Sequence, residues 1–344
     1  MPPKEDDRSD LVLREYQPGD ETKVLELFNR VFGSQAPDDF RVRSLDHWYW
    51  KFRDNPAGII DLFLAFNGIG ECVGQYAGVP NRFWMQGEQF FSSQSVDSVT
   101  DPRYRKGLQR PGLFVNLGYE YASTFGGRHR DIIMYGYPVP HHYRIGNKYL
   151  KYHLIRGINF LVKEHLLGYG AEPPNEEVTV EIVDRYGPEA DQVWEKTKGE
   201  LAAAHVRDAA YLNWRFADHP DIDYRLLLAK DAKTGEPRGL AALRDGGYAP
   251  EIVSLIEWLV PFEDHATEDM LLHRAYEMTR DIGKQLLVGW FPEATKQFER
   301  FQKTHDFYVN FTPYIQVVRP YDPGVSIEWL RENWYQTMGD MDLY

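Results

Sequence analysis

The chain has 344 residues, 43% of them hydrophobic, and a formal charge of −13 from 39 basic and 52 acidic residues. This acidic balance argues against nonspecific binding to nucleic acid, which depends on attraction to phosphate. The single cysteine, Cys72, excludes a disulfide framework within the chain and favours a reducing compartment. The N-terminus lacks the apolar segment of a signal peptide, and no window reaches the length of a membrane span. We therefore expect a soluble, cytoplasmic protein without a membrane partner.

The first half of the chain predicts an α/β arrangement. Val24, Leu27, Phe28 and Val31 recur at helical spacing, and Gly33 marks the end of that helix. In chain order we expect a strand over 11–16, helices over 17–33 and 44–52, strands over 59–66, 71–85 and 88–100, a helix from residue 113, a strand over 131–137, a helix from about residue 141 and a strand over 154–162. Helices alternating with a mixed, mostly antiparallel sheet define this class.

The second half repeats the first. The motif W-[KR]-F-x-D-x-P occurs at Trp50–Pro56 and again at Trp214–Pro220, 164 positions later, and each copy precedes two strand-like segments. Residues 135–152 and 289–307 match in the same order at a similar offset. Two ordered matches favour duplication over coincidence. The linker-like segment 168–177, rich in Gly, Pro and acids, predicts domains over 1–168 and 176–344.

Several aromatic segments are expected to be structural. The repeat preserves W-[KR]-F in both halves, so the aromatics around Trp48, Trp50 and Phe52 are predicted to lie in the core, and Asp54 and Asp218 to hold a turn. The tail over 326–344 carries apolar residues at helical spacing. We expect it to pack on the body of the protein or on a second subunit, as in a homodimer.

A cationic loop precedes the helix that begins near Leu113. It contains four basic residues and two glycines: Arg103, Arg105, Lys106, Arg110, Gly107 and Gly112. A helix N-terminus presents unpaired N–H groups and the positive end of the helix dipole, and glycine lets the backbone approach an anion closely. The loop is therefore a candidate anion site, with a solvated charged loop as the alternative.

The element order, the Q-x-x-G at residues 109–112 and the later 136-GYP…KY-152 segment resemble the GNAT acetyltransferase superfamily, especially its tandem members. The resemblance covers nearly the whole chain. It implies that backbone amides of the loop hold the pyrophosphate of coenzyme A, that Arg105 and Arg110 contact the adenosine phosphates, and that the preceding strand pairs with pantetheine. The implied coenzyme-binding residues are Ser98, Val99, Thr100, Arg105, Gln109, Arg110, Pro111, Gly112, Leu113 and Phe114. Phe114 replaces a small residue of the family pattern, and Pro111 removes one N–H.

The resemblance also suggests catalytic groups. Asp97, beside the expected thioester, is the candidate base, acting directly or through water, with a strand-end carboxylate that caps the loop as the alternative. The family commonly uses a tyrosine in the helix after the fifth strand as general acid. Asn147 holds the usual position here, so we expect Tyr143 to protonate the leaving thiolate. His141 and His142 are either a proton relay or exposed caps; their spacing offers no third metal ligand, so no metal is expected. Cys72 is expected to be a structural thiol.

The leading hypothesis is an acetyl-CoA-dependent N-acyltransferase that acts on the primary amine of a small molecule by direct attack in a ternary complex. The acidic surface suggests a cationic acceptor. The second half is expected to be a degenerate copy, because its corresponding connection, 261–267, has two acids and neither glycine nor arginine. Two alternatives stay open: an acyl-carrier-protein or aminoacyl-tRNA donor, and a protein that binds acyl-CoA without turnover.

Overall fold

The computed structural model describes residues 10–35, 40–105, 111–168 and 172–342. Gln109 and Arg110, two of the predicted coenzyme-binding residues, lie outside these ranges. Within them, no helix is both long and apolar enough to cross a membrane.

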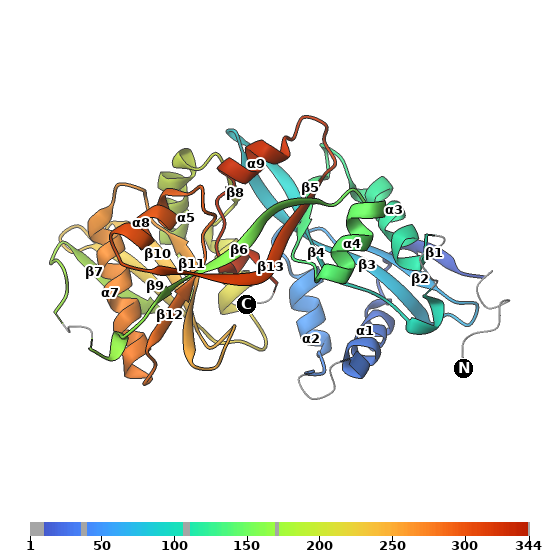
Figure 1. Cartoon of the computed structure of the whole chain (residues 1–344), viewed down its shortest axis with the longest axis horizontal. Helices are drawn as coiled ribbons and strands as arrows, with labels where there is room; N and C mark the ends of the chain where they lie inside the picture. Colours follow the sequence, from blue (N-terminus) through green and yellow to red (C-terminus); the bar gives the residue numbers. More distant parts are fainter. Residues whose placement is uncertain (1–9, 36–39, 106–110, 169–171, 343–344) are drawn as a thin grey trace. The chain divides into compact units, whose positions relative to one another are not determined.

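The first half follows the predicted order closely (Figure 1). Its elements are β1 (Val12–Glu15), α1 (Glu21–Gln35), α2 (Leu45–Trp48) continued by a π-helical turn (Tyr49–Arg53), β2 (Asp61–Phe66), β3 (Cys72–Met85), β4 (Glu88–Thr100), α3 (Leu113–Phe125), β5 (Asp131–Gly136), α4 (Pro140–Tyr149) and β6 (His153–Lys163). The second half contains β7 (Val178–Val183), α5 (Pro188–Thr197), β8 (Ala203–His205), α6 (Ala209–Leu212) with its π-helical turn (Asn213–Ala217), β9 (Tyr224–Asp231), β10 (Pro237–Asp245), β11 (Ile252–Leu259), α7 (His265–Asp281), β12 (Leu286–Gly289), α8 (Lys296–Lys303), β13 (Tyr308–Pro320) and α9 (Ile327–Asn333).

The duplication predicted from the sequence is confirmed element by element. Apart from the extra strand β8, the elements from β7 to β13 repeat those from β1 to β6. Both copies of W-[KR]-F lie in a π-helical turn that continues a short α-helix. That helix is capped in one copy by the Ser44 side chain and in the other by the Asp208 side chain. The repeated motif therefore specifies the same local structure twice.

The chain divides into two compact units that do not coincide with the predicted domains. Unit 1 draws its described residues from 1–82, 90–155 and 315–327, and unit 2 from 83–89, 156–314 and 328–344. The last strand of each repeat has been exchanged, because β6 pairs with β12 and β13 pairs with β5. The division at 1–168 and 176–344 therefore separates the repeats but not the units. Strand pairing depends on contacts far apart in sequence, which linker composition does not reveal.

In unit 1 the strand order is β1-β2-β3-β4-β5-β13. The pairs β1–β2, β2–β3 and β5–β13 are antiparallel, and β4–β5 is parallel. Side chains alternate between the two faces of a strand. Phe63 and Tyr76 point to the face covered by α3, where they share a core cluster with Leu117 and Tyr121. Gln75, next to Tyr76, points to the opposite face.

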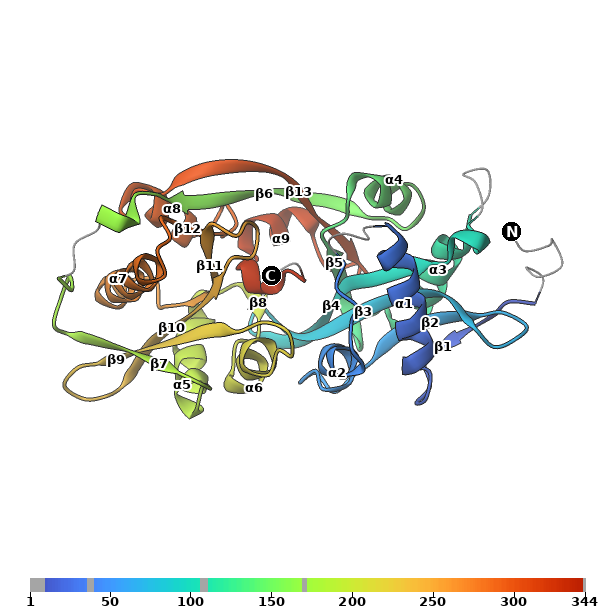
Figure 2. The same cartoon turned by 90° about the horizontal axis from the view of Figure 1, so that it is seen from below.

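In unit 2 the order is β13-β6-β12-β11-β10-β9-β7, and β8 pairs with the end of β3. Helices α5 and α6 cover one face of this sheet and α7 covers the other (Figure 2). The C-terminal segment is buried in this unit: Trp334 has no exposed surface and its ring lies 5.3 Å from that of Phe83. The tail therefore packs on the body of the protein, one of the two expected outcomes.

Candidate functional site

Strand β4 departs from regular pairing near its C-terminal end. The register of β4 with β5 runs from Phe91 to Gln94, although β4 continues to Thr100. At Asp97 the backbone adopts a φ of 45°, a conformation rare for residues other than glycine. Ser98 Oγ accepts a hydrogen bond from the Ala77 backbone N–H at 3.0 Å. The chain therefore bulges where the resemblance places the thioester.

The Asp97 side chain is held by two cations. Its Oδ2 lies 2.5 Å from Arg43 Nη1 and 3.0 Å from Lys51 Nζ. The Asp97 and Lys51 side chains are 7% and 4% exposed. Burial alone would raise the pKa of the Asp97 carboxyl, but Arg43 and Lys51 outweigh it and hold that pKa well below its usual range. A carboxylate so stabilised is a weak proton acceptor, so the base role stays a prediction. The alternative role, capping the loop, falls to Asp101, which accepts from the Arg103 backbone N–H at 2.9 Å.

A small hollow opens beside Asp97 on the face of the sheet that carries α1 and α2. Its cavity volume is about 10 Å³, which is room for roughly one water molecule. Its lining is an apolar wall joined to a polar corner: Val24, Leu25, Phe28, Arg43, His47, Trp48, Phe52, Gln75 and Asp97. Gln75 Nε2 donates to the Asp97 carbonyl at 2.5 Å and so ties β3 to the bulge. An ion cluster, a bulged strand and an apolar wall thus meet at one place in unit 1.

The predicted anion site is a helix start without a side-chain cap. Gly112 is the N-cap residue of α3, and its carbonyl accepts from the backbone N–H groups of Val115 and Asn116. Arg105 Nε donates to the Thr100 carbonyl at 3.2 Å, which holds the loop's arginine beside the end of β4. In unit 2 the corresponding helix α7 is capped by Asp264, whose side chain accepts from the Thr267 N–H. Of these two helix starts, only the one in unit 1 is suited to an anionic ligand.

Phe114 lies at the start of α3, and His141, His142 and Tyr143 lie in the first turn of α4. The Phe114 ring stacks on that of His142 at 5.9 Å, which brings the start of α3 and the start of α4 together. His141 and His142 are exposed. Tyr143 is partly buried against the core cluster and does not line the hollow beside Asp97. Burial raises the pKa of the Cys72 thiol to about 12, in keeping with a structural cysteine.

Sequence reasoning missed three polar residues that line the hollow, Arg43, His47 and Gln75. It also missed Lys51, which does not line the hollow but pairs with Asp97. Lys51 lies inside the repeated motif, which the sequence predicts to be structural because both halves preserve it. A lysine between Trp50 and Phe52 was a usable signal, because a charge in an apolar segment needs a partner when it is buried. The local pattern did not indicate which residue that partner would be.

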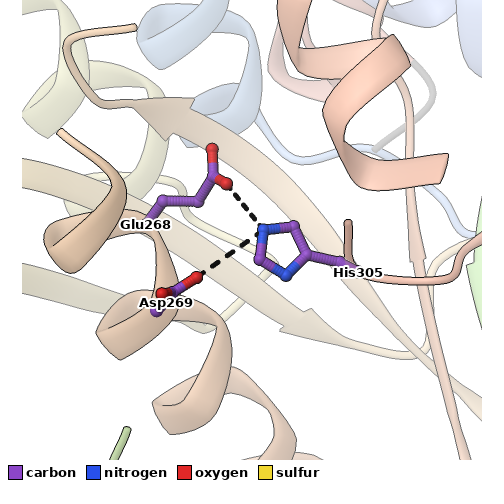
Figure 3. A group of neighbouring side chains, drawn as sticks. All are labelled: Glu268, Asp269 and His305. Carbon is purple, nitrogen blue, oxygen red and sulfur yellow. Dashed lines mark hydrogen bonds and ion pairs between the residues drawn. The ribbon is translucent and has the colours of Figure 1, made fainter. Parts of the chain in front are cut away.

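Among the described residues, Glu268, Asp269 and His305 present ligand atoms within 4.8 Å of one another (Figure 3). His305 Nε2 lies 2.6 Å from Glu268 Oε1. The same oxygen accepts a hydrogen bond from Arg300 Nε. A metal ion at this position would face the Arg300 guanidinium, so we assign the cluster to the ion pairs that join α7 and α8.

Comparisons with solved structures find the same fold. A protein from Enterococcus faecalis described as a probable N-acyltransferase aligns at a TM-score of 0.64 and 12% identity over 93% of this chain and 74% of its own. A tandem GNAT protein from the clavulanic acid biosynthesis pathway aligns at 0.55 and 12% over 92% and 100%. Saccharomyces cerevisiae N-myristoyltransferase with bound myristoyl-CoA aligns at 0.53 and 8% over 90% and 82%.

No model of a known protein family matches the sequence, and no curated protein matches it at the sequence level. The structural likenesses nevertheless establish the architecture. The chain carries the α/β fold of the GNAT N-acyltransferases, and it carries that fold twice in tandem.

Proposed function

We propose that the chain transfers an acyl group, with acetyl-CoA as the simplest donor, to the primary amine of a small molecule. One observation carries the proposal: in unit 1 the end of β4 leaves the β5 ladder beside an uncapped helix start. Ser98, Val99 and Thr100 lie beyond the register with β5, and their backbone would pair with pantetheine on that side, as the resemblance implies. The neighbours described as N-acyltransferases, and the one with bound myristoyl-CoA, support a coenzyme A thioester as donor.

The start of α3 would hold the coenzyme's pyrophosphate. Backbone N–H groups from Gly112 to Phe114 are at the positive end of the helix dipole. Arg105, beside Thr100, would contact the adenosine phosphates, and Gln109 and Arg110 would complete the loop. In the second copy Asp264 already satisfies the helix start and would repel a diphosphate. We therefore assign the donor to unit 1.

The acceptor amine would approach the thioester from the face of the sheet that carries the Asp97 side chain. Its nitrogen attacks the thioester carbonyl carbon, the new C–N bond forms, and the C–S bond breaks. The amine must lose a proton and the thiolate must gain one. We propose that a water molecule oriented by the Asp97 carboxylate accepts the amine's proton and passes it to solvent, and that Tyr143 donates the proton that the thiolate gains.

The coenzyme site is tested by Gly112→Asp, with Gly112→Ala as its matched control. Aspartate is a favourable N-cap, so the helix and the melting temperature should be retained. Its carboxylate would repel the pyrophosphate, and we expect acetyl-CoA affinity by calorimetry to fall at least tenfold relative to Gly112→Ala. Thiol release across a panel of amines should fall in parallel. Unchanged affinity and turnover in Gly112→Asp would refute the proposal.

A further inference from the structure

Two aspartates of unit 1 are buried together, although the proposed acyl transfer uses neither of them. Asp61 is the first residue of β2 and Asp131 is the first residue of β5, and neither has any exposed surface. Their side chains form a hydrogen bond with each other. An ionised carboxyl offers acceptors only, so two carboxylates cannot form such a bond. The bond therefore requires a proton on one of the two carboxyls.

Each of the two carboxyls has one oxygen with a donor and one without. Asp61 Oδ1 accepts a hydrogen bond from Arg130 Nη2. Asp131 Oδ2 accepts one from the Tyr121 hydroxyl at 3.2 Å. The other two oxygens, Asp61 Oδ2 and Asp131 Oδ1, are buried and have no donor in the part of the chain that the structure describes. Buried polar atoms are rarely left unsatisfied, and one proton between these two oxygens would satisfy both.

Neutral hydroxyl groups complete the surroundings of the pair. On β4, Ser93 Oγ lies 2.9 Å from the Tyr121 hydroxyl and can donate to it while Tyr121 donates to Asp131. Burial raises the pKa of Tyr121, on α3, and of Tyr321, which follows β13. Both phenols therefore keep their protons and add no charge beside the pair.

The charges around the pair favour a proton on Asp131 rather than on Asp61. Burial, followed by the like charge of Asp61, raises the pKa of Asp131 well above its ordinary range. Burial also raises the pKa of Asp61, but there Arg130 opposes it, and Glu15 on β1 adds a weaker repulsion. Two carboxyls that share one site do not ionise together readily. Asp61, which binds the guanidinium, is therefore the carboxyl that stays ionised.

The second repeat forms the same fold without this pair. At the place of Asp61, 164 positions later, it has Arg225, which is exposed. Strand β12, the counterpart of β5, begins at Leu286 where β5 begins at Asp131. The architecture therefore does not require two buried carboxyls, and the pair is a particular feature of unit 1.

We infer that unit 1 carries one buried proton at neutral pH, which Asp131 Oδ1 donates to Asp61 Oδ2 while Asp61 stays ionised against Arg130. The shared proton joins the start of β2 to the start of β5. The Tyr121 hydroxyl joins this pair to α3, the helix whose start is the candidate anion site. Loss of the proton at higher pH leaves two buried negative carboxyls side by side and weakens these connections. The pair is thus a pH-sensitive clamp within unit 1, and it does not depend on the proposed acyl transfer.

The test compares the pH dependence of urea unfolding in wild type and in Asp131→Asn. Above about pH 4 the unfolded chain ionises both carboxyls, whereas the folded chain keeps one proton, so unfolding releases a proton. The contribution of the pair is complete below that pH and is lost as the pH rises. Between about pH 5 and about pH 7 we expect the unfolding equilibrium constant of wild type to rise about tenfold per pH unit relative to that of Asp131→Asn. The asparagine amide can donate to Asp61 as the protonated carboxyl does, so the variant is expected to fold.

Two further variants and one measurement on wild type complete the test. Asp54→Asn removes a half-exposed carboxyl and should keep the wild-type dependence on pH. Asp61→Asn removes the carboxylate that binds Arg130, so at neutral pH it should destabilise the protein more than Asp131→Asn does. Carbon-13 NMR of wild type at neutral pH should show one aspartate carboxyl carbon with the chemical shift of a protonated acid. The inference is overturned if wild type and Asp131→Asn respond alike to pH, if Asp61→Asn is the less damaging variant, or if no aspartate carboxyl is protonated at neutral pH.

Discussion

Lys51 shows that a residue of the repeated motif depends on a distant partner. Its side chain is 4% exposed, and it contacts the Asp97 carboxylate. Burying an unpaired ammonium is costly, so a lysine at this depth requires a partner. In the second repeat Arg215 is equally buried but binds main-chain carbonyls of the tail. Both copies thus keep a buried cation, and the partner that satisfies it differs.

Asp97→Asn should destabilise the protein strongly, because it leaves Arg43 and Lys51 without their shared carboxylate. Removing one partner of a buried ion cluster costs about 3–5 kcal/mol. Urea unfolding would measure the loss. Asp54→Asn is the matched control, since Asp54 is half exposed and pairs with Arg53 at the surface. Its effect should stay within about 1 kcal/mol. Equal, small losses in both variants would contradict the structural role of the Asp97 ion pairs.

The same ion pairs predict a dependence of stability on acid. The folded-state pKa of Asp97 is depressed, so its contribution is complete above its unfolded pKa of about 4 and is lost as the pH falls below that value. Wild type should therefore lose unfolding free energy more steeply than Asp97→Asn between neutral pH and about pH 3. Parallel curves for the two proteins would show that the carboxyl titrates alike in both states.

Single residues also show how much of the site could be predicted from the sequence. Asp97 was identified from its place on the strand before the loop, a local property. Its partners were not, because Lys51 and Arg43 are 46 and 54 positions away and reach it only when α2 packs on the sheet. Gln75 was missed for the same reason. A glutamine in an apolar strand gives no sign of the atom it will face.

At the scale of elements, hydrophobic patterning predicted most helices and strands of the first half within a few residues. The helix expected over 44–52 exists, but it ends as a π-helical turn over Tyr49–Arg53. Side-chain periodicity does not determine whether a backbone N–H bonds to the fourth or the fifth residue before it, so this feature was not predictable. The contrast between the helix starts of α3 and α7 was predictable, because it depends on the capping residues themselves.

Helix α4 contains a glycine whose absence of a side chain is required by packing. A Cβ on Gly146 would lie 2.1 Å from Cδ2 of Tyr152. Tyr152 is buried, and its hydroxyl forms a hydrogen bond with the hydroxyl of Tyr76, so the ring has little freedom to move. Alanine is the better helix former by about 1 kcal/mol. Any net loss of stability in Gly146→Ala must therefore come from the clash.

We expect Gly146→Ala to lower the free energy of unfolding by about 1–3 kcal/mol, the usual cost of overpacking. Thermal and urea unfolding would measure it. Gly157→Ala is the control, since a Cβ at that exposed position of β6 meets nothing within 4 Å. A Gly146→Ala protein as stable as wild type would mean that α4 shifts away from Tyr152 without cost.

At the scale of the whole molecule, duplication was visible in the sequence and the asymmetry between the copies was visible in part. The acidic connection 261–267 indicated a copy without a diphosphate site, and Asp264 caps the helix start there. The contacts of Arg207 and Arg215 with the C-terminal segment were not predictable, since helical spacing around Trp334 shows only that the tail packs somewhere. In the second copy the two equivalent cations thus bind the chain's own end, whereas in the first copy they bind Asp97.

The exchange of β6 and β13 predicts that the two repeats cannot fold separately. A fragment of residues 1–168 would lack residues 315–320, whose Val317 and Val318 are buried beside β5. It would also expose Phe160 and Leu161, which are buried in unit 2. An unpaired sheet edge and uncovered apolar side chains both favour aggregation. We expect neither this fragment nor 176–344 to show a cooperative unfolding transition when expressed alone.

Co-expression of the two fragments should restore folding, because each supplies the strand that the other lacks. The measurements are co-purification through a tag on one fragment and a single cooperative transition for the pair. Two fragments that fold independently at near wild-type stability would contradict this expectation and would restore the boundary that the linker composition suggested. The result has a consequence for the proposed site, since β13 borders β5, the strand from which β4 separates. If unit 1 requires β13, the geometry that would receive the thioester depends on a strand encoded in the other repeat.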